Sequence, residues 1–323
     1  MLDYINLHRR GELQERIAEA WKFLEDCVVC PRQCHVNRIE NERGFCNSGF
    51  FPMISSWGPH YGEEAPLVGT KGSGTIFLTN CNMRCEFCQN YEISQCGKGD
   101  EMSFEKLAEI MVQLQKIGCH NINFVSPTHF IPQIIKSLEI AIPKGLNVPL
   151  VYNSGGYDAV PTIQLLDGIF DIYMPDAKYG RDDIALALSH APNYSTVMRA
   201  AIKEMYKQVG DLVVENGIAV RGLIIRHLVL PYNLANSEVI MKFIREEVSR
   251  DSYVNIMAQY RWPRRVLLDK NGKPNDVEKN PLLKLIQRPI NIEEFAYAIQ
   301  CAKDNGLHRG FENSPFNKFS SSF

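Results

Sequence analysis

A chain of 323 residues with 45% hydrophobic residues can bury a large core, and a formal net charge of −2 gives no overall field that would attract nucleic acid or a membrane surface. No stretch reaches the ~18 apolar residues of a membrane span, and the start, MLDYINLHRRGELQERIAEAW, lacks the apolar region of a signal peptide. We therefore expect a cytoplasmic protein with no membrane partner and no general affinity for nucleic acid.

The first 71 residues are expected to form a helix followed by a loop-rich extension. Apolar residues recur at helical spacing over residues 12–25, at Leu13, Ile17, Ala20, Trp21 and Leu24. Residues 26–71 contain cysteines, charges and turn residues but no steady hydrophobic period. We interpret this part as a Cys-rich extension that is organised by metal.

From residue 75 onward, short apolar runs alternate with helical patterns. Strands are expected at residues 75–79, 121–125, 148–152, 169–174, 222–230 and 253–258. Helices are expected from Ser103 to near Gly118 and at residues 131–142, 158–166, 193–209 and 237–248. This alternation predicts an α/β fold with a parallel sheet and right-handed crossovers, a partial (β/α)6 barrel over residues 72–262.

The last segment, residues 263–323, is expected to be a helical tail. Residues 262–290 are rich in Pro, Lys and Asn, which predicts a long loop. A helix is expected to follow at residues 292–305.

Seven of the ten cysteines fall between Cys27 and Cys88. Three of them have the spacing Cys81-x3-Cys85-x2-Cys88, directly after the first expected strand. A disulfide takes two cysteines and structural zinc takes four ligands, whereas three thiolates suit a cubane iron–sulfur cluster with one open iron. The alternative is a zinc site that borrows His120 or His129 as its fourth ligand.

Polar residues follow every expected strand. In a parallel barrel these positions lie on one rim, where active sites are built. Besides the cysteines, the rim residues are Ser126, Thr128, His129, Asn153, Ser154, Gly155, Gly156, Asp176, Lys178, Arg226, His227, Gln259 and Tyr260.

The stretch CNMRCEFC resembles the CxxxCxΦC signature of the radical S-adenosylmethionine (SAM) superfamily, with Phe87 at the aromatic position. The resemblance covers residues 72–262. It is closest to the glycyl-radical-enzyme activases of the pyruvate formate-lyase activating type, and to a related uncharacterised iron–sulfur branch. It implies that Cys81, Cys85 and Cys88 hold a 4Fe–4S cluster whose open iron binds SAM. One electron from a reductant such as flavodoxin or ferredoxin would then cleave SAM to methionine and a 5′-deoxyadenosyl radical.

The resemblance also implies roles for the rim residues. Phe87 would lie near the adenine, and Arg226 would reach the carboxylate or ribose of SAM. Two further motifs, VYNSGGYD and YMPDAK, would contact SAM through Asn153, Ser154, Gly156, Met174, Asp176 and Lys178. Activases carry Gly-Gly-Glu after the second strand to receive the SAM amino group, whereas this chain has NFVSPTHF, so Ser126, Thr128 or His129 would take that place. A structural ion pair of Asp176 and Lys178 is the alternative for those two residues.

The expected function is abstraction of hydrogen from a protein substrate, with a backbone glycine as the hypothesis that the resemblance implies. Within the same chemistry, the substrate could instead be another protein residue, an RNA or a small molecule. A rival from a different class is a non-catalytic iron–sulfur or zinc protein that transfers electrons or binds a partner.

A second group has the spacing Cys27-x2-Cys30-x3-Cys34-x11-Cys46. Four cysteines suit a tetrahedral zinc site or a second iron–sulfur cluster. The segment resembles the N-terminal part of the uncharacterised branch named above. It could fold the extension, relay electrons or contact the substrate. The other cysteines, Cys96, Cys119 and Cys301, are expected to be ordinary thiols.

Overall fold

The computed structural model describes residues 2–261 and 280–311. The larger part of the loop expected at residues 262–290 lies outside the described residues. Within its described end, residues 282–285 form a short helix, α11 (Leu282–Leu285).

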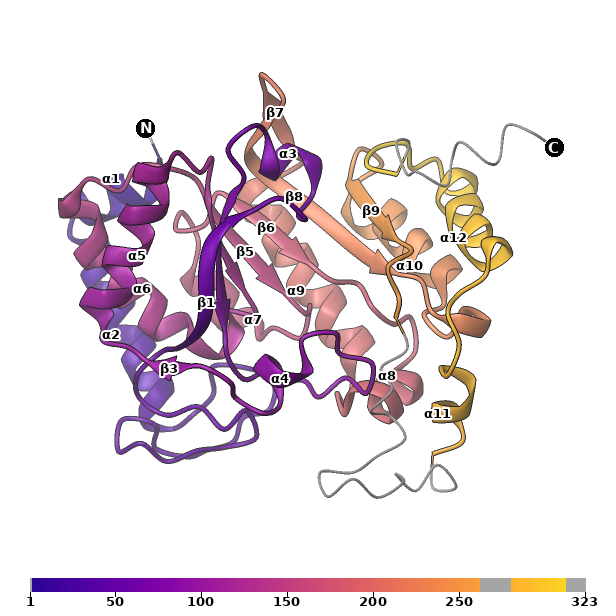
Figure 1. Cartoon of the computed structure of the whole chain (residues 1–323), viewed down its shortest axis with the longest axis horizontal. Coiled ribbons are helices and arrows are strands. Elements are labelled where there is room, and N and C mark those ends of the chain that lie inside the picture. Colours follow the sequence, from indigo (N-terminus) through magenta and orange to yellow (C-terminus); the bar gives the residue numbers. More distant parts are fainter. Residues whose placement is uncertain (1, 262–279, 312–323) are drawn as a thin grey trace.

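Six parallel strands form the centre of one sheet, and they confirm the predicted partial (β/α)6 barrel (Figure 1). Each strand pairs in parallel with the next along the chain. The six are β2 (Ser73–Leu78), β4 (Ile122–Val125), β5 (Leu150–Ser154), β6 (Ile172–Pro175), β8 (Ile218–Leu228) and β9 (Tyr253–Met257). Within the described chain β2 and β9 do not pair, so the barrel stays open.

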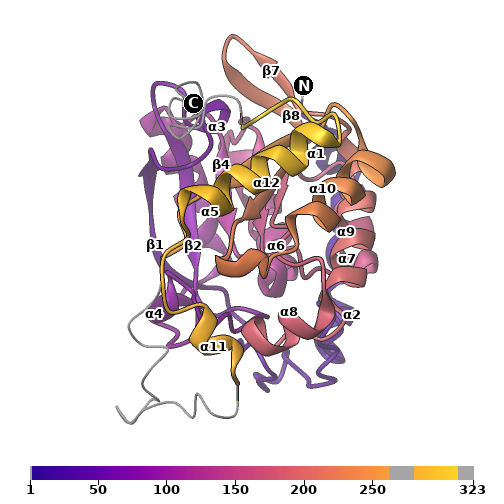
Figure 2. The ribbon, with the colours of Figure 1, turned by 90° about the vertical axis from the view of Figure 1, so that its right-hand side faces the viewer.

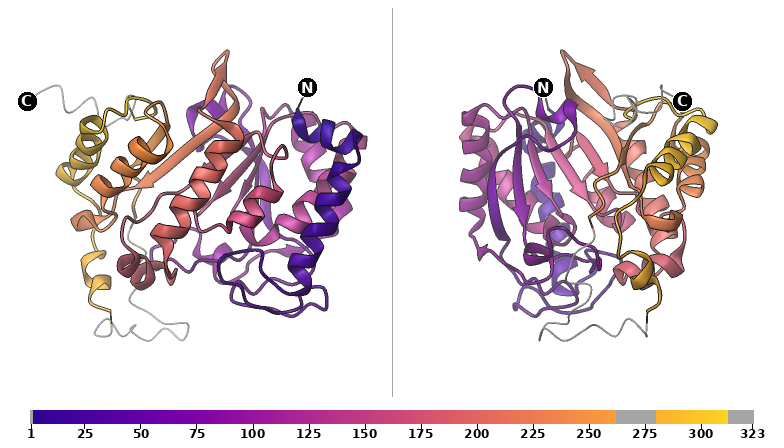
Figure 3. Two further views of the ribbon diagram at one scale, coloured as in Figure 1. Left: turned by 180° about the vertical axis from the view of Figure 1, so that it is seen from behind. Right: turned by 45° about the vertical axis from the view of Figure 1, so that its right-hand side comes forward.

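Helices cover the outer face of this sheet, as the view from behind shows (Figure 3). They are α5 (Phe104–Ile117), α6 (Ile131–Ala141), α7 (Val160–Leu165), α9 (Tyr194–Val209) and α10 (Ser237–Phe243). The bounds of α5 follow from its caps, as predicted: the Ser103 side chain accepts from the Lys106 backbone N–H, and Gly118 ends the helix at φ 104°. An additional short helix, α8 (Asp182–Ser189), was not expected from the sequence.

The extension contains more regular structure than the sequence indicated. Before the expected helix α2 (Glu12–Glu25) lies α1 (Asp3–Arg9). Residues 53–60, expected to be loop, form strand β1 (Met53–His60), which pairs antiparallel with β2 and with the short β3 (Asp100–Glu101). The sequence MISSWGPH did not indicate this strand, because it contains Gly and Pro, which are depleted in strands, and most of its side chains are partly buried or exposed.

The helical tail is confirmed by α12 (Ile292–Asp304), which begins with a capping box formed by Asn291 and Glu294. This helix packs against α10 (Figure 2). One buried core includes Leu24 of the extension, Phe124 of the barrel and Phe295 of the tail. The segment boundaries after residues 71 and 262 stay predictions.

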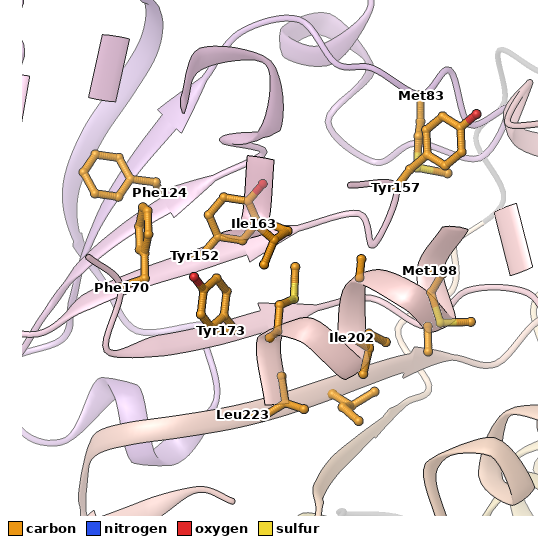
Figure 4. Packing of buried hydrophobic residues seen from close by; sticks show 14 of the residues in the cluster. Met83, Phe124, Tyr152, Tyr157, Ile163, Phe170, Tyr173, Met198, Ile202 and Leu223 are labelled. Carbon is orange, nitrogen blue, oxygen red and sulfur yellow. The ribbon is translucent and has the colours of Figure 1, made fainter. Parts of the chain in front are cut away.

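Alternation along the strands divides the buried residues between the two faces of the sheet. Tyr152 and Tyr173 point outward and pack with Phe170 and Phe124 beneath the helices (Figure 4). The inner face holds a second cluster that includes Val151, Ile172, Met174 and Ile224. Leu67, from the short helix α3 (Ala65–Val68), packs into this inner cluster. Within residues 2–261 and 280–311, no helix combines the length and the apolar character that crossing a membrane requires.

Candidate functional site

The loop after β2 carries Cys81, Cys85 and Cys88, all partly buried and without disulfides. The backbone N–H of Met83 donates to Cys81 Sγ at 3.3 Å, and Cys88 Sγ lies 3.1 Å from Ser94 Oγ. Burial, reinforced by the neighbouring Cys85, raises the pKa of Cys81 to about 12. Such a thiol stays protonated at neutral pH, and coordination to a metal cation is what would convert it to a thiolate.

The donor set around these thiols fits a cluster better than a zinc ion. The two histidines that could complete a zinc site are engaged elsewhere: His129 Nε2 lies 2.8 Å from the Thr79 carbonyl oxygen, and His120 Nε2 accepts from two backbone N–H groups. In the part of the chain that the structure describes, no three Cys, His, Asp or Glu side chains converge to hold a single metal ion. Each thiolate of a cubane binds its own iron, so cluster ligands need not converge on one point.

Three charged side chains meet at the ends of neighbouring strands β6 and β8. Arg226 Nε donates to Asp176 Oδ1 at 2.7 Å, and Lys178 Nζ also donates to Asp176. Burial alone would raise the pKa of Asp176, but the charges of Arg226 and Lys178 outweigh burial and hold it below its usual value. Asp176 therefore stays ionised between these two cations, and Glu64 and Glu63 also act electrostatically on Arg226.

Lys178 joins this charged group to the cysteine loop. Burial raises the pKa of Cys85 to about 11, and the nearby charge of Lys178 opposes that rise. Gly155, after β5, lies against the same loop, because a Cβ added there would be 3.0 Å from Met83 Sδ. The sequence-predicted rim of β5 and β6 is thus adjacent to the thiols.

Asn153 extends the group toward the extension and reveals residues that sequence reasoning missed. Its Oδ1 accepts from Arg226 Nη2 at 2.6 Å, and its Nδ2 donates to Glu63 at 3.5 Å. The neighbouring Glu64 accepts from Asn255 of β9 at 2.8 Å. The pair Glu63–Glu64 follows the unexpected strand β1, and no pattern in the sequence connects it with the rim.

Gly156 and Met174 are both fixed by close packing. Gly156 has φ +75°, and a Cβ there would come within 2.0 Å of the Asp176 carbonyl oxygen. Tyr194 Oη lies 2.8 Å from the carbonyl oxygens of both Gly155 and Asp176. Met174 is fully buried on the inner face, where it pairs in register with Asn153.

The candidates for receiving the SAM amino group, Ser126, Thr128 and His129, differ in what their side chains already contact. Thr128 and Ser154 each donate a hydroxyl to the buried Asp158, both at 2.6 Å, and Tyr152 donates to the same carboxylate at 2.7 Å. His129 is buried, and burial lowers its pKa to about 3. Ser126 differs, because it is partly exposed and adopts φ 57° at the end of β4.

Phe87 belongs to an aromatic group rather than standing alone. Its ring meets the rings of Tyr179 and Tyr260 edge-on, with centroids 6.4 and 5.7 Å away. Two residues on, Gln89 Nε2 donates to the Gln259 carbonyl oxygen at 2.5 Å. The cysteine loop therefore spans from β2 to the chain that leaves β9.

Residues 75–244 match the family model of the radical SAM superfamily. The chain belongs to the radical SAM superfamily. It is 33% identical over 260 residues to the uncharacterized protein MJ0674 of Methanocaldococcus jannaschii, covering 77% of this chain and 70% of that protein. A second uncharacterized protein of that organism, MJ0808, is 24% identical over 246 residues, covering 70% of this chain and 68% of that protein.

Solved structures with a similar arrangement include TYW1 with a lysine–pyruvate adduct bound, at TM-score 0.44 and 11% identity, covering 73% of this chain and 74% of that one. HydG, a maturase of the FeFe-hydrogenase, has TM-score 0.46 and 11% identity, covering 76% of this chain and 53% of that one.

Membership of the radical SAM superfamily implies a 4Fe–4S cluster and SAM as cofactors. The matched region includes the rim residues from Cys81 to His227, whereas Gln259 and Tyr260 lie beyond it. Their individual roles toward SAM stay predictions. The superfamily match does not extend to Cys27, Cys30, Cys34 and Cys46.

Proposed function

We propose that Cys81, Cys85 and Cys88 hold the 4Fe–4S cluster and that the charged group beside it binds SAM for reductive cleavage. The observation that carries this proposal is the convergence of Arg226 and Lys178 on the buried Asp176, within electrostatic range of Cys85. When bound, the cluster supplies one electron, taken from a low-potential reductant, that cleaves SAM to methionine and a 5′-deoxyadenosyl radical.

The charged group is suited to the methionine end of SAM, which carries a carboxylate and an amino group. Lys178 has three N–H donors and Arg226 has five, so donors remain for a carboxylate after Asp176 and Asn153 are satisfied. Asp176 and Asn153 offer oxygen acceptors for an amino group. Because these groups are already oriented by one another, little reorganisation accompanies binding.

The aromatic group of Phe87, Tyr179 and Tyr260 gives the loop an apolar side. These rings are nearly inaccessible to solvent, with Phe87 at 5% and Tyr260 at 4% exposure. An apolar wall of this kind excludes water, which protects a reactive radical from side reactions. Phe87 and its partners are therefore assigned to shielding the adenosyl group.

Anaerobic reconstitution with iron and sulfide, followed by dithionite and SAM, tests the proposal through the yield of 5′-deoxyadenosine. The Cys85→Ala variant is expected to give none, while Cys96→Ala, at an exposed cysteine, is expected to keep the wild-type yield. Formation of 5′-deoxyadenosine by Cys85→Ala would contradict the assignment of Cys85 as a cluster ligand. Cluster incorporation without any product in the wild type would favour the electron-transfer alternative.

For the substrate, we propose a protein chain whose backbone glycine loses hydrogen, as in glycyl-radical-enzyme activases. The support is the resemblance of residues 72–262 to that branch, including the motif YMPDAK. Peptides containing α-deuterated glycine provide the test, because abstraction transfers deuterium to 5′-deoxyadenosine, which mass spectrometry detects. Product without deuterium would contradict glycine as the donor and direct the search to other protein residues, RNA and small molecules.

A further inference from the structure

The extension brings four cysteines together outside the radical SAM site. Cys27, Cys30 and Cys46 are buried and Cys34 is partly buried. Their sulfurs lie within electrostatic range of one another: Cys46 acts on both Cys27 and Cys30, and Cys34 acts on Cys30. Residues from two separate parts of the extension therefore meet in one sulfur-rich group.

Backbone N–H groups point at three of these four sulfurs. Val29 donates to Cys27 and Arg32 donates to Cys30, in each case from two residues further along the chain. The same relation joins Met83 to Cys81 in the cluster loop. Phe45 N–H donates to Cys34 Sγ at 3.4 Å. These donors oppose, without outweighing, the burial that raises the pKa of Cys27 and Cys30, and they can donate to sulfurs whose protons a metal cation has replaced.

A buried cation lies against the same group. Arg38 is 1% exposed, and its guanidinium donates to the carbonyl oxygens of Gly49 and His129 and to Cys27. No carboxylate pairs with it within the described ranges. A guanidinium stays charged in proteins, and an isolated buried charge is very costly. Cys27 lies against the guanidinium, and as a metal-bound thiolate it would supply negative charge there.

Two further arginines connect the sulfur group to the cluster loop. The Arg32 guanidinium carbon lies 3.7 Å from the Phe45 ring centroid, and that of Arg84 lies 4.5 Å from the same ring. Arg32 also donates to the Asn82 carbonyl oxygen at 2.9 Å, and Arg84 donates to that of Phe45 at 2.9 Å. Arg32 lies between Cys30 and Cys34 in sequence, and Arg84 lies between Cys81 and Cys85. The two cysteine groups are therefore held together through one aromatic ring.

We infer that Cys27, Cys30, Cys34 and Cys46 bind a second metal centre through four thiolates, neutralised by Arg38 and seated against the radical SAM cluster loop. Four thiolates suit a second iron–sulfur cluster or a tetrahedral zinc ion, and the metal content decides between them. The inference does not depend on the proposed cleavage of SAM, because it concerns ligands outside that site.

The test uses the full chain with Cys81, Cys85 and Cys88 all changed to Ala, so that only the second group can bind metal. Iron, zinc and acid-labile sulfide are measured per chain after anaerobic purification, with circular dichroism as the check of folding. About four irons with sulfide are expected. Stoichiometric zinc would also support the centre and would identify its metal. A folded variant with neither metal would overturn the inference.

Two added substitutions separate the second group from adventitious binding. In the same background, Cys30→Ser is expected to remove the metal, while Cys96→Ser, at an exposed cysteine, is expected to leave the content unchanged. Equal metal content in both variants would overturn the inference. If Cys30→Ser does not fold, native-state alkylation decides: Cys34 is protected from iodoacetamide until a chelator is added, whereas modification at equal rates with and without chelator contradicts a bound metal.

Arg38 provides a test of the charge argument. Arg38→Met is expected to shorten the half-time of metal loss to a chelator roughly tenfold, the usual size of effects from groups that contact metal ligands. Arg43→Met, at a partly exposed surface ion pair with Glu101, is the matched control and is expected to leave the half-time unchanged. Equal half-times for both variants would contradict the role of Arg38.

Discussion

Arg226 and Asp176 lie opposite each other on neighbouring parallel strands, and the Arg226 Nε donates to the Asp176 carboxylate at 2.7 Å. Both side chains are shielded from solvent, with 16% and 8% of their surfaces exposed. An ion pair in this setting is oriented by the strand register, so the register of β6 against β8 positions the proposed SAM ligands.

Replacing Arg226 tests that arrangement directly. Arg226→Met removes a donor to Asp176 and a donor to Asn153. Truncating one partner of a buried charge pair costs about 2–5 kcal/mol of binding free energy, so we expect the Kd for SAM of the reconstituted protein to rise roughly 30-fold or more. Equilibrium dialysis with SAM measures the change. Arg221→Met, on the same strand but exposed and paired with Asp3, is expected to bind SAM like the wild type. Unchanged affinity in Arg226→Met would remove Arg226 from the SAM site.

Gly156 lies in the turn after β5, and Gly217, directly before β8, serves as its matched control. Both have positive φ, but a Cβ at Gly217 meets nothing within 4 Å, whereas one at Gly156 meets the Asp176 carbonyl oxygen at 2.0 Å. Gly217→Ala is expected to cost about 1–2 kcal/mol of unfolding free energy. Gly156→Ala is expected to cost more and to weaken SAM binding, since it displaces Asp176. Urea unfolding and dialysis measure the two effects, and equal costs would contradict the close approach.

Substitutions at Thr128 and Ser126 are expected to have different effects, the first on stability and the second on SAM binding. Thr128→Val leaves the buried Asp158 without one of its three hydroxyl donors and is expected to cost about 1–3 kcal/mol of unfolding free energy. Ser126→Ala is expected to leave stability nearly unchanged and to weaken SAM binding. Urea unfolding measures stability and dialysis measures binding. Wild-type SAM affinity in Ser126→Ala would exclude its hydroxyl as a ligand.

Two buried histidines are expected to make stability depend on pH. Burial lowers the pKa of His129 to about 3 and that of His227 to about 4. An unfolded histidine titrates near 6.5, so below that pH the unfolded state takes up protons that the folded state does not. Each histidine therefore makes the unfolding free energy fall by about 1.4 kcal/mol per pH unit as the pH drops from about 6 toward its folded pKa.

The unfolding free energy is compared between variants rather than read from one pH curve. Burial raises the pKa of Asp171 to about 7, and this carboxyl makes the unfolding free energy rise as the pH drops, opposite to the histidines. Between pH 6.5 and 5, the unfolding free energy of His129→Gln is expected to fall less steeply than that of the wild type. Parallel curves for the two proteins would contradict the buried neutral state of His129.

The alternating pattern of the barrel was readable from the sequence because each strand is a short apolar run and α5 carries its own caps at Ser103 and Gly118. The thiols, Asp176 and Lys178 were predictable for a related reason: residues directly after a parallel strand lie on one edge of the sheet. Arg226 meets Asp176 at that edge although it lies inside β8, near the end of the strand.

Other parts of the site depend on contacts between distant segments, and local patterns do not encode these. Glu63 reaches Asn153 only because β1 pairs with β2 and returns the chain to the inner face. Thr128 and Ser126 both lie just after β4, yet only the folded chain brings Thr128 to Asp158, thirty residues later, where its hydroxyl donates to the carboxylate. The contacts of Arg32 could not be predicted from the sequence, because its partners Asn82 and Phe45 become its neighbours only after folding.

The open side of the barrel has a mechanical consequence. Neighbouring strands are joined by ladders of backbone hydrogen bonds, whereas the cysteine loop reaches the chain after β9 through the Gln89 amide and the contact of Phe87 with Tyr260. A junction made of individual side chains separates at lower cost than a ladder, so local opening begins there. Amide hydrogen exchange in residues 87–89 and 258–260 will be faster than in the paired strands, and it will report how firmly the loop is closed.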